Sequence, residues 1–192
     1  MTRKPRVDAA HNRRHIVAVA HAAFAAEGLE LPMREIARRA GLGVATLYRH
    51  FPSRPDLIGA VLAEQAADCG AAMRAALDDP DPWRALSGLI RRFADYQLRA
   101  RGLNDGVLGS HAAGLPFAEQ RRAHARGLER LVERARRTEA VRPELSVEDV
   151  RVGLWAIASF RTIPPERAGT AVPRLANLLL TALAPGSGSR QS

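Results

Sequence analysis

The stretch "REIARRAGLGVATLYRHF", residues 34–51, decides how this chain folds. Two glycines, Gly41 and Gly43, stand two positions apart between two short helical patterns. Gly41 permits the left-handed backbone that commonly ends a helix, and Gly43 suits the extended position that precedes the next one. The sequence therefore predicts a helix over 33–40, a tight turn and a second short helix over 44–50.

The second short helix would expose an unusual set of side chains. Leu47 and Phe51 are four residues apart, so both face inward, and Pro52 prevents the helix from continuing. The residues left around the helix are Val44, Ala45, Thr46, Tyr48, Arg49 and His50. This polar, aromatic and cationic face suits a groove lined with phosphates. The pattern indicates a helix-turn-helix, in which the second helix enters the major groove of DNA.

Helical periodicity continues through the rest of the chain, and no run of alternating β-branched residues predicts a strand. We expect further helices over residues 10–27, 54–77, 82–101, 103–111, 116–138, 147–161 and 170–184. Ser53 and the capping box "SVED", residues 146–149, mark two of the starts. The chain is therefore expected to be all-α.

The helices group into two expected domains and a tail. A helix-turn-helix domain that binds DNA is expected over residues 1–53. Its two short helices are too short to persist alone, so they must pack against longer neighbouring helices. A helical bundle follows over residues 54–184. The last segment, "PGSGSRQS" at residues 185–192, is expected to be disordered.

The composition fits this organisation. With 192 residues, 46% of them hydrophobic, the chain can bury a core in one or two small domains. The net charge of +9 favours an anionic partner, and residues 1–60 contribute +5 of it, from ten basic and five acidic residues. Because 28 of the 29 basic residues are arginine, a GC-rich coding bias also explains part of the surplus. Charge alone is weak evidence for a nucleic-acid partner.

The sequence also bears on where the protein works. Its longest apolar runs, at residues 152–160 and 177–184, are well short of the roughly 20 residues that cross a bilayer. The N-terminal "TRKPR" leads into charged residues and not into the apolar core of a signal peptide. The single cysteine, Cys69, has no second cysteine with which to form a disulfide framework. We therefore expect a cytoplasmic protein without a membrane span.

Residues 24–57 also resemble a known family. The resemblance is carried by the F and G of "FAAEG", by the IA, AG and "TLYRHF" of "IARRAGLGVATLYRHF", and by the L of "SRPDL". These residues look like the N-terminal DNA-binding domain of the TetR family of bacterial transcriptional repressors. The resemblance implies a homodimer that binds a palindromic operator. It also implies a C-terminal domain for dimerisation and for a small-molecule effector that releases the DNA, in a protein that represses or, less commonly, activates transcription.

The position of each residue on the second short helix assigns its part in DNA binding. The expected phosphate contacts are Tyr48, His50 and Arg54, with Thr46 on a phosphate or a base edge, and the expected contacts to thymine methyl groups are Val44 and Ala45. Arg49 is either a further contact or a solvated surface arginine. The basic arm at residues 3–6 either enters the minor groove or contributes only salt-dependent attraction.

The helix expected over 147–161 is apolar on more than one face. One apolar side carries Val150, Leu154 and Ile157. The other side carries Val152, Trp155 and Ser159. A second apolar face needs a partner, so this helix and the one over 170–184 predict an interface of four helices across the two-fold axis of a homodimer. The alternative is that both faces belong to the internal core.

Two polar residues interrupt the apolar stripe of the helix expected over 116–138. Arg121 and His124 stand where core residues are expected, and burying them without partners would be costly. We therefore expect an effector pocket, lined by Leu89, Phe93, Tyr96, His111, Phe117, Arg121, His124 and Trp155. The alternative is that Arg121 and His124 lie at a solvated edge of the bundle.

Other functions fit the sequence less well. "GLG" lacks the preceding strand and the third glycine of a nucleotide-binding turn, and the six histidines include no pair that has both metal-ligand spacing and an acidic partner. Neither a cofactor nor a metal is therefore expected. No catalytic motif occurs, so we do not expect an enzyme. A helical protein-interaction module without operator binding is the remaining alternative, but it gives no reason for Thr46, Tyr48 and His50 to share an exposed face.

Overall fold

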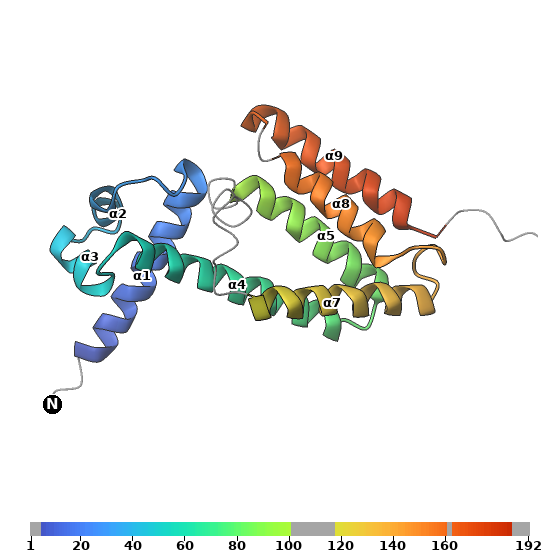
Figure 1. Cartoon of the computed structure of the whole chain (residues 1–192), viewed down its shortest axis with the longest axis horizontal. Helices are drawn as coiled ribbons and strands as arrows, with labels where there is room; N and C mark the ends of the chain where they lie inside the picture. The colour runs from blue at the N-terminus through green and yellow to red at the C-terminus, as the bar shows by residue number, and fades with distance from the viewer. Residues whose placement is uncertain (1–4, 101–117, 161–162, 186–192) are drawn as a thin grey trace, which may run out of the picture. The chain divides into compact units, whose positions relative to one another are not determined.

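The computed structural model describes residues 5–100, 118–160 and 163–185. Within these ranges the chain forms eight helices and no strand (Figure 1). They are α1 (Pro5–Glu27), α2 (Met33–Arg39), α3 (Val44–His50), α4 (Arg54–Asp78), α5 (Pro82–Arg99), α7 (Ala118–Arg137), α8 (Val147–Ser159) and α9 (Pro165–Leu183). The prediction of an all-α chain is confirmed. The helix expected over 103–111 lies outside the described residues, as does the tail beyond residue 185.

Two helices begin earlier than the sequence predicted. α1 begins at Pro5 instead of near residue 10, and α9 begins at Pro165 instead of near residue 170. Proline suits a first helical position because its φ is fixed and its missing N–H would have no partner there. The buried stripe of α9 opens with Ala168, a small residue that contributes little to an apolar pattern.

The chain divides into two compact units. Of the described residues, 5–67 and 99–100 belong to the first unit, and 68–98, 118–160 and 163–185 belong to the second. Helix α4 therefore contributes its first half to one unit and its second half to the other. The expected domain boundary at residue 53 is a functional division and stays a prediction.

The first unit packs α1, α2, α3 and the start of α4 around a small core. Its largest fully buried side chains are Ile16, Phe24, Ile36, Leu47, Phe51 and Leu57. Helices α2 and α3 have seven residues each, too few to persist alone in water. Helix α2 packs against α1 and α3, and α1 and α4 add the buried side chains Phe24, Leu57 and Val61, while Val19 is half-buried.

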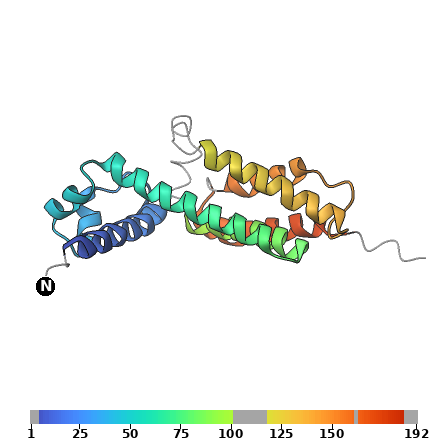
Figure 2. The same cartoon turned by 90° about the horizontal axis from the view of Figure 1, so that it is seen from below.

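The second unit is a bundle of α5, α7, α8, α9 and the second half of α4. Its core includes Met73, Leu86, Ile90, Leu131, Leu145, Val150, Ile157, Val172 and Leu180. Helix α7 lies along the C-terminal end of α4 (Figure 2), where Arg134 donates hydrogen bonds to the carbonyls of Leu77 at 2.7 Å and Ala76 at 3.0 Å. These bonds satisfy carbonyls that the end of α4 leaves without helical partners.

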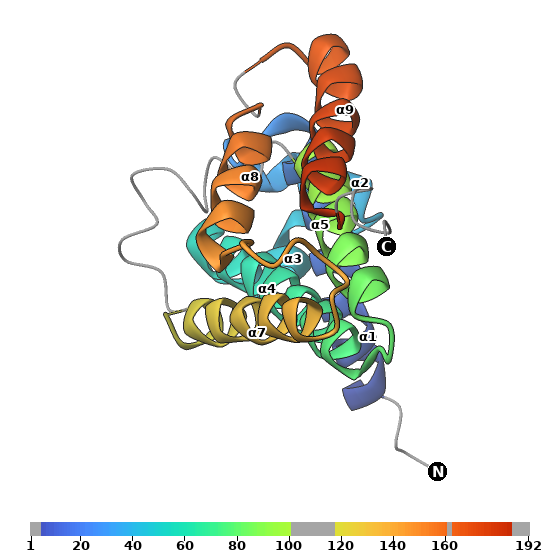
Figure 3. The same ribbon diagram turned by 90° about the vertical axis from the view of Figure 1, so that its right-hand side faces the viewer.

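Helices α8 and α9 run side by side in close contact (Figure 3). A Cβ atom added to Gly153 of α8 would lie 2.5 Å from both methyl carbons of Leu179 on α9. Glycine therefore permits an approach at this point that any larger side chain would disturb.

The predicted capping box at the start of α8 is confirmed. Ser146 Oγ accepts from the Asp149 N–H at 3.1 Å, and Asp149 Oδ2 accepts from the Ser146 N–H at 2.8 Å. Ser53 and Asp56 exchange the same two bonds at the start of α4. Over the described ranges, no helix combines the length and the apolarity needed to span a bilayer.

Candidate nucleic-acid interface

The turn between α2 and α3 has the backbone that its two glycines predicted. Gly41 adopts a φ of +66°, in the left-handed region, and the Leu42 N–H closes the end of α2 on the Ala37 carbonyl at 2.9 Å. Gly43 is extended, with φ −67° and ψ 144°, and its carbonyl accepts from the Thr46 N–H at 2.9 Å. The turn therefore fixes where α3 starts relative to α2.

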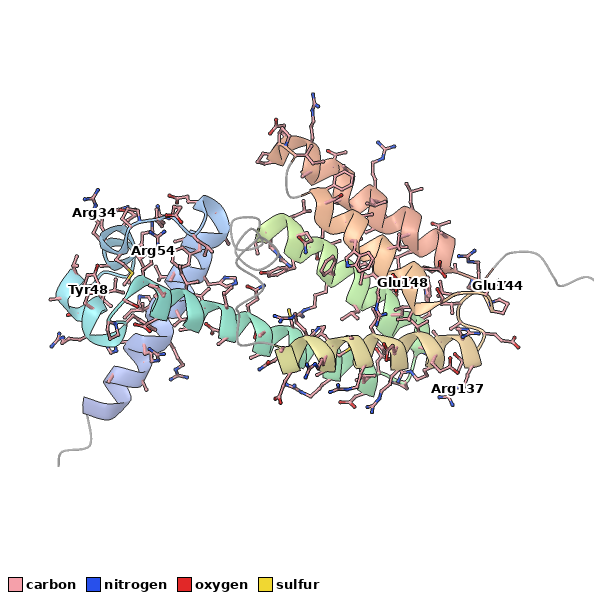
Figure 4. The ribbon with its side chains drawn as sticks, viewed as in Figure 1. Arg34, Tyr48, Arg54, Arg137, Glu144 and Glu148 are labelled. Carbon is pink, nitrogen blue, oxygen red and sulfur yellow. The ribbon has the colours of Figure 1, made fainter. Side chains whose placement is uncertain are left out.

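Helix α3 presents one buried side and one exposed side. Leu47 and Phe51 are 0% and 1% exposed, as predicted. Val44 and Tyr48 are 42% and 45% exposed, and Tyr48 lies at the outer side of the helix (Figure 4). We call the residues around this outer side the recognition face: Val44, Ala45, Thr46, Tyr48, Arg49 and His50. Ala45 and Arg49 are exposed, and Thr46 and His50 are half-buried.

Arg49 and Thr46 interact within the recognition face. Arg49 Nη2 donates to Thr46 Oγ1 at 2.9 Å. A hydroxyl that accepts one hydrogen bond still has its own hydrogen to donate. Thr46 can therefore donate to a phosphate or base acceptor while Arg49 holds its oxygen in place.

Arg54 points away from the solvent-facing position that the sequence suggested. Its Nη2 donates to the Leu29 carbonyl and lies 3.4 Å from Glu30 Oε2, and its side chain is 30% exposed. The first residue of α4 is thus tied to the loop after α1. A phosphate contact by Arg54 requires the guanidinium to leave these two oxygens, and it stays a prediction.

An ion-pair network that the sequence analysis missed joins α1 to α2. The Glu35 carboxylate accepts from Arg38 at 2.7 Å and from Arg39 at 2.8 Å, and Arg39 also pairs with Glu27 at 2.6 Å. The hydrogen bonds from Arg38 and then Arg39 lower the pKa of Glu35 to about 2, so its carboxylate stays ionised at neutral pH. The spacing of Glu35, Arg38 and Arg39 at i, i+3 and i+4 is the signal that predicts such pairs.

Arg34 is a further candidate for DNA contact. It lies in the first turn of α2, is exposed, and makes no ion pair with any residue of the described ranges (Figure 4). In a helix-turn-helix the first helix crosses the DNA backbone, where such a cation would meet phosphates. Sequence reasoning missed it, because a lone surface arginine is common and carries no periodic signal.

Two side chains of α1 reach the C-terminal ends of the short helices. His15 Nε2 lies 3.2 Å from the Ala40 carbonyl, so its N–H can donate to the end of α2. Arg13 Nη1 donates to the His50 carbonyl at 3.2 Å, and its guanidinium lies 4.3 Å from the centroid of the Phe51 ring. Neither contact was predicted, since these residues are 25 and 37 positions apart in sequence.

The residues expected to line an effector pocket fall into three groups. Leu89, Phe93 and Tyr96 on α5 are half-buried, as is His124 on α7. Burial lowers the pKa of His124, which favours the neutral imidazole. His111 and Phe117 lie outside the described residues.

The other two expected pocket residues are exposed. Arg121 lies in the first turn of α7, and its exposure agrees with the alternative of a solvated edge; the first residue of this helix that is buried is Gly127, and the place of Arg121 in an effector pocket stays a prediction. Trp155 is 63% exposed on α8, so the described residues leave most of its side chain uncovered. The helical stripe was extended from the sequence beyond the point where neighbouring helices cover it.

Large exposed hydrophobic or aromatic side chains occur on three helices. Within the described residues they are Val44 and Tyr48 on α3, and Val152, Trp155 and Leu178 on α8 and α9. The last three are 55%, 63% and 67% exposed, and we call them the exposed apolar set. They lie on the two helices from which the sequence predicted a dimer interface.

Comparison with known proteins agrees with this architecture. Residues 16–61 match the bacterial regulatory proteins of the tetR family, and residues 81–185 match the C-terminal domain of SbtR-like transcriptional regulators. An HTH-type transcriptional regulator of Staphylococcus aureus is 47% identical over 53 residues, which span 27% of this chain and only 29% of that protein.

Two solved structures resemble almost the whole chain. The TetR transcription regulatory protein from Mycobacterium vanbaalenii is 30% identical, with a TM-score of 0.70, over 93% of this chain and 98% of its own. A TetR transcriptional regulator from Streptomyces coelicolor is 32% identical, with a TM-score of 0.69, over 91% of this chain and 99% of its own. The chain therefore belongs to the TetR family and is a transcriptional regulator with a DNA-binding helix-turn-helix, not an enzyme.

Proposed function

We propose that the protein is a cytoplasmic repressor that binds a palindromic operator as a homodimer and releases it when a small molecule binds the second unit. The observation that carries the proposal is the recognition face. Val44 and Tyr48 are exposed at nearly half of their surface on a helix whose inner side is fully buried. An apolar and aromatic side chain held outward on a rigid short helix is suited to a groove and costly in solvent alone.

The recognition face divides into residues that position the protein and residues that read sequence. Tyr48 and His50 contact phosphates, and Thr46 donates its hydroxyl to a phosphate or a base. Val44 and Ala45 lie against thymine methyl groups. Arg34 adds a phosphate contact from α2 in this proposal, and Arg54 does so only after leaving Leu29.

Dimerisation uses α8 and α9 in this proposal. The exposed apolar set supports it, because large hydrophobic side chains at more than half exposure mark surfaces that a partner covers. An isologous interface pairs the same two helices from each protomer. Such a dimer can present its two recognition faces about 34–36 Å apart, which is one turn of B-DNA.

The effector binds between α5 and α7 in this proposal. Leu89 and Phe93 supply apolar contact, and the neutral His124 imidazole can both donate and accept a hydrogen bond. Helix α4 contributes to both units, so a ligand that favours one position of α4 changes the spacing of the recognition faces. Release then requires the ligand to bind the non-operator arrangement more tightly.

Selection of duplexes from a random-sequence pool by the full-length protein tests the operator proposal. We expect a palindromic consensus with two half-sites about 10 base pairs apart, centre to centre. Gel shift with that duplex should give one complex of two protomers, and a transcription assay with the duplex over a promoter should show repression. A consensus without two-fold symmetry, or increased transcription, contradicts the proposal.

A further inference from the structure

We infer that Arg13 is a positioning residue for DNA recognition: from α1 it fixes the C-terminal end of α3 and so orients the recognition face. The inference rests on the proposed role of that face. Arg13 makes two contacts at this end, a hydrogen bond of 3.2 Å to the His50 carbonyl and a cation–π contact of 4.3 Å with the Phe51 ring. His50 is the last residue of α3, and Phe51 follows it directly.

The end of α3 cannot satisfy its own carbonyls. The Phe51 N–H bonds to the Leu47 carbonyl at 2.9 Å, but Phe51 itself is extended, with φ −137° and ψ 92°, so the chain leaves the helix there and no following helical turn offers an N–H to the His50 carbonyl. Arg13 supplies the missing donor at His50, and it brings a positive charge to the negative end of the helix dipole. Because α3 has only two turns, one contact at its end acts on the whole helix.

The geometry separates this role from a phosphate contact. One edge of the Arg13 guanidinium donates to a carbonyl, and its face covers a ring that is 1% exposed. Its neighbour Arg14 is exposed, and no hydrogen bond or ion pair within the described residues involves it. Arg14→Ala therefore removes the same charge from the same turn without touching α3, which makes it a matched control.

The test compares two DNA probes with full-length protein: the duplex selected by the parent from a random-sequence pool, and a scrambled duplex of equal composition. We expect Arg13→Ala to weaken binding to the selected duplex about tenfold, ~1.4 kcal/mol, relative to Arg14→Ala. The two variants should bind the scrambled duplex equally. Arg13→Lys should recover part of the loss, because an ammonium can still donate to the His50 carbonyl.

Salt dependence distinguishes positioning from phosphate binding. The logarithm of the DNA-binding constant falls linearly with the logarithm of the salt concentration, and each lost phosphate contact reduces the magnitude of that slope by about 0.9. We expect equal slopes for Arg13→Ala and Arg14→Ala. A direct phosphate contact would instead make the slope for Arg13→Ala about 0.9 smaller in magnitude than that for Arg14→Ala and would weaken binding to both duplexes equally. That result overturns the inference.

Two further results also overturn the inference. One is that Arg13→Ala binds the selected duplex as tightly as Arg14→Ala does. The other is that its loss disappears once affinities are corrected for the folded fraction, measured by urea unfolding, which would make Arg13 merely structural. Tyr48→Ala serves as the reference: if it weakens binding while Arg13→Ala does not, the recognition face stands and only the role of Arg13 fails. If neither variant weakens binding, the recognition face itself is wrong.

Discussion

Replacing Trp155 by alanine tests the dimer proposal at its largest exposed side chain. A tryptophan can bury about 150–250 Å², and 63% of Trp155 is exposed in the single chain. A partner that covers this fraction removes about 95–160 Å² from water on each protomer, worth about 2.4–4 kcal/mol at ~25 cal/mol/Å². Two-fold symmetry places the residue in the interface twice.

The expected loss is smaller than this area implies, because association has its own entropic cost and alanine keeps some contact. Truncation of a well-buried interface tryptophan typically costs about 2 kcal/mol or more. At about 2 kcal/mol for each of two copies, the dissociation constant should rise about a thousandfold. Sedimentation of Trp155→Ala at micromolar concentration should then show the 20.8 kDa single chain, while the parent sediments as a dimer.

The control is Val44→Ala, which truncates an exposed hydrophobic residue of the other unit and should leave the dimer intact. The unfolding free energy of the Trp155→Ala monomer should differ from that of the parent monomer by less than about 0.5 kcal/mol, because the side chain packs little within its own chain. A Trp155→Ala protein that sediments like the parent dimer, with Val44→Ala unchanged, refutes the proposal that α8 forms the interface.

Five further substitutions test the site and its support. Tyr48→Ala should weaken binding to selected and scrambled duplexes alike, whereas Val44→Ala should change the preference at one base pair by roughly 1–3 kcal/mol in competition binding. Gly41→Ala should lower the urea unfolding free energy by about 1–2 kcal/mol, because alanine resists the left-handed φ of +66°. Gly43→Ala, at φ −67°, should change the unfolding free energy by less than about 0.5 kcal/mol. Equal losses of unfolding free energy at both glycines would contradict this reasoning. Because burial lowers the folded-state pKa of His124, the unfolded state takes up a proton first as pH falls below about 6.5. Stability should therefore fall with pH until the folded-state pKa is passed, and His124→Gln should show a smaller fall in urea unfolding from pH 7.5 to 5.5.

The parts of the fold governed by local rules could be predicted from the sequence. A positive φ at Gly41, the capping box at Ser146 and the inward pair Leu47 and Phe51 each depend on residues within one or two turns. The start of α9 escaped prediction because Pro165 and the small Ala168 carry no apolar pattern. Local chemistry thus determined the helix-turn-helix almost completely.

The contacts that hold the recognition face could not be predicted in the same way. Arg13 contacts the His50 carbonyl only because the fold brings α1 close to the end of α3, and the spacing of residues in the sequence does not predict this tertiary contact. Arg54 was assigned to a phosphate from its position in the chain, but position does not tell which nearby oxygen its guanidinium binds. The exposure of Arg121 could not be decided from the sequence for a related reason, since periodicity gives the direction of a side chain and not whether another helix covers it.

The close approach of Gly153 to Leu179 has a kinetic consequence. Since α8 and α9 already pack together within one chain, the proposed interface is assembled before a second chain arrives. Refolding should then show a first-order phase whose rate is independent of protein concentration, followed by a second-order phase that accelerates as the concentration rises. Two rigid surfaces should associate at about 10⁵–10⁷ M⁻¹s⁻¹, the range for partners that dock without refolding.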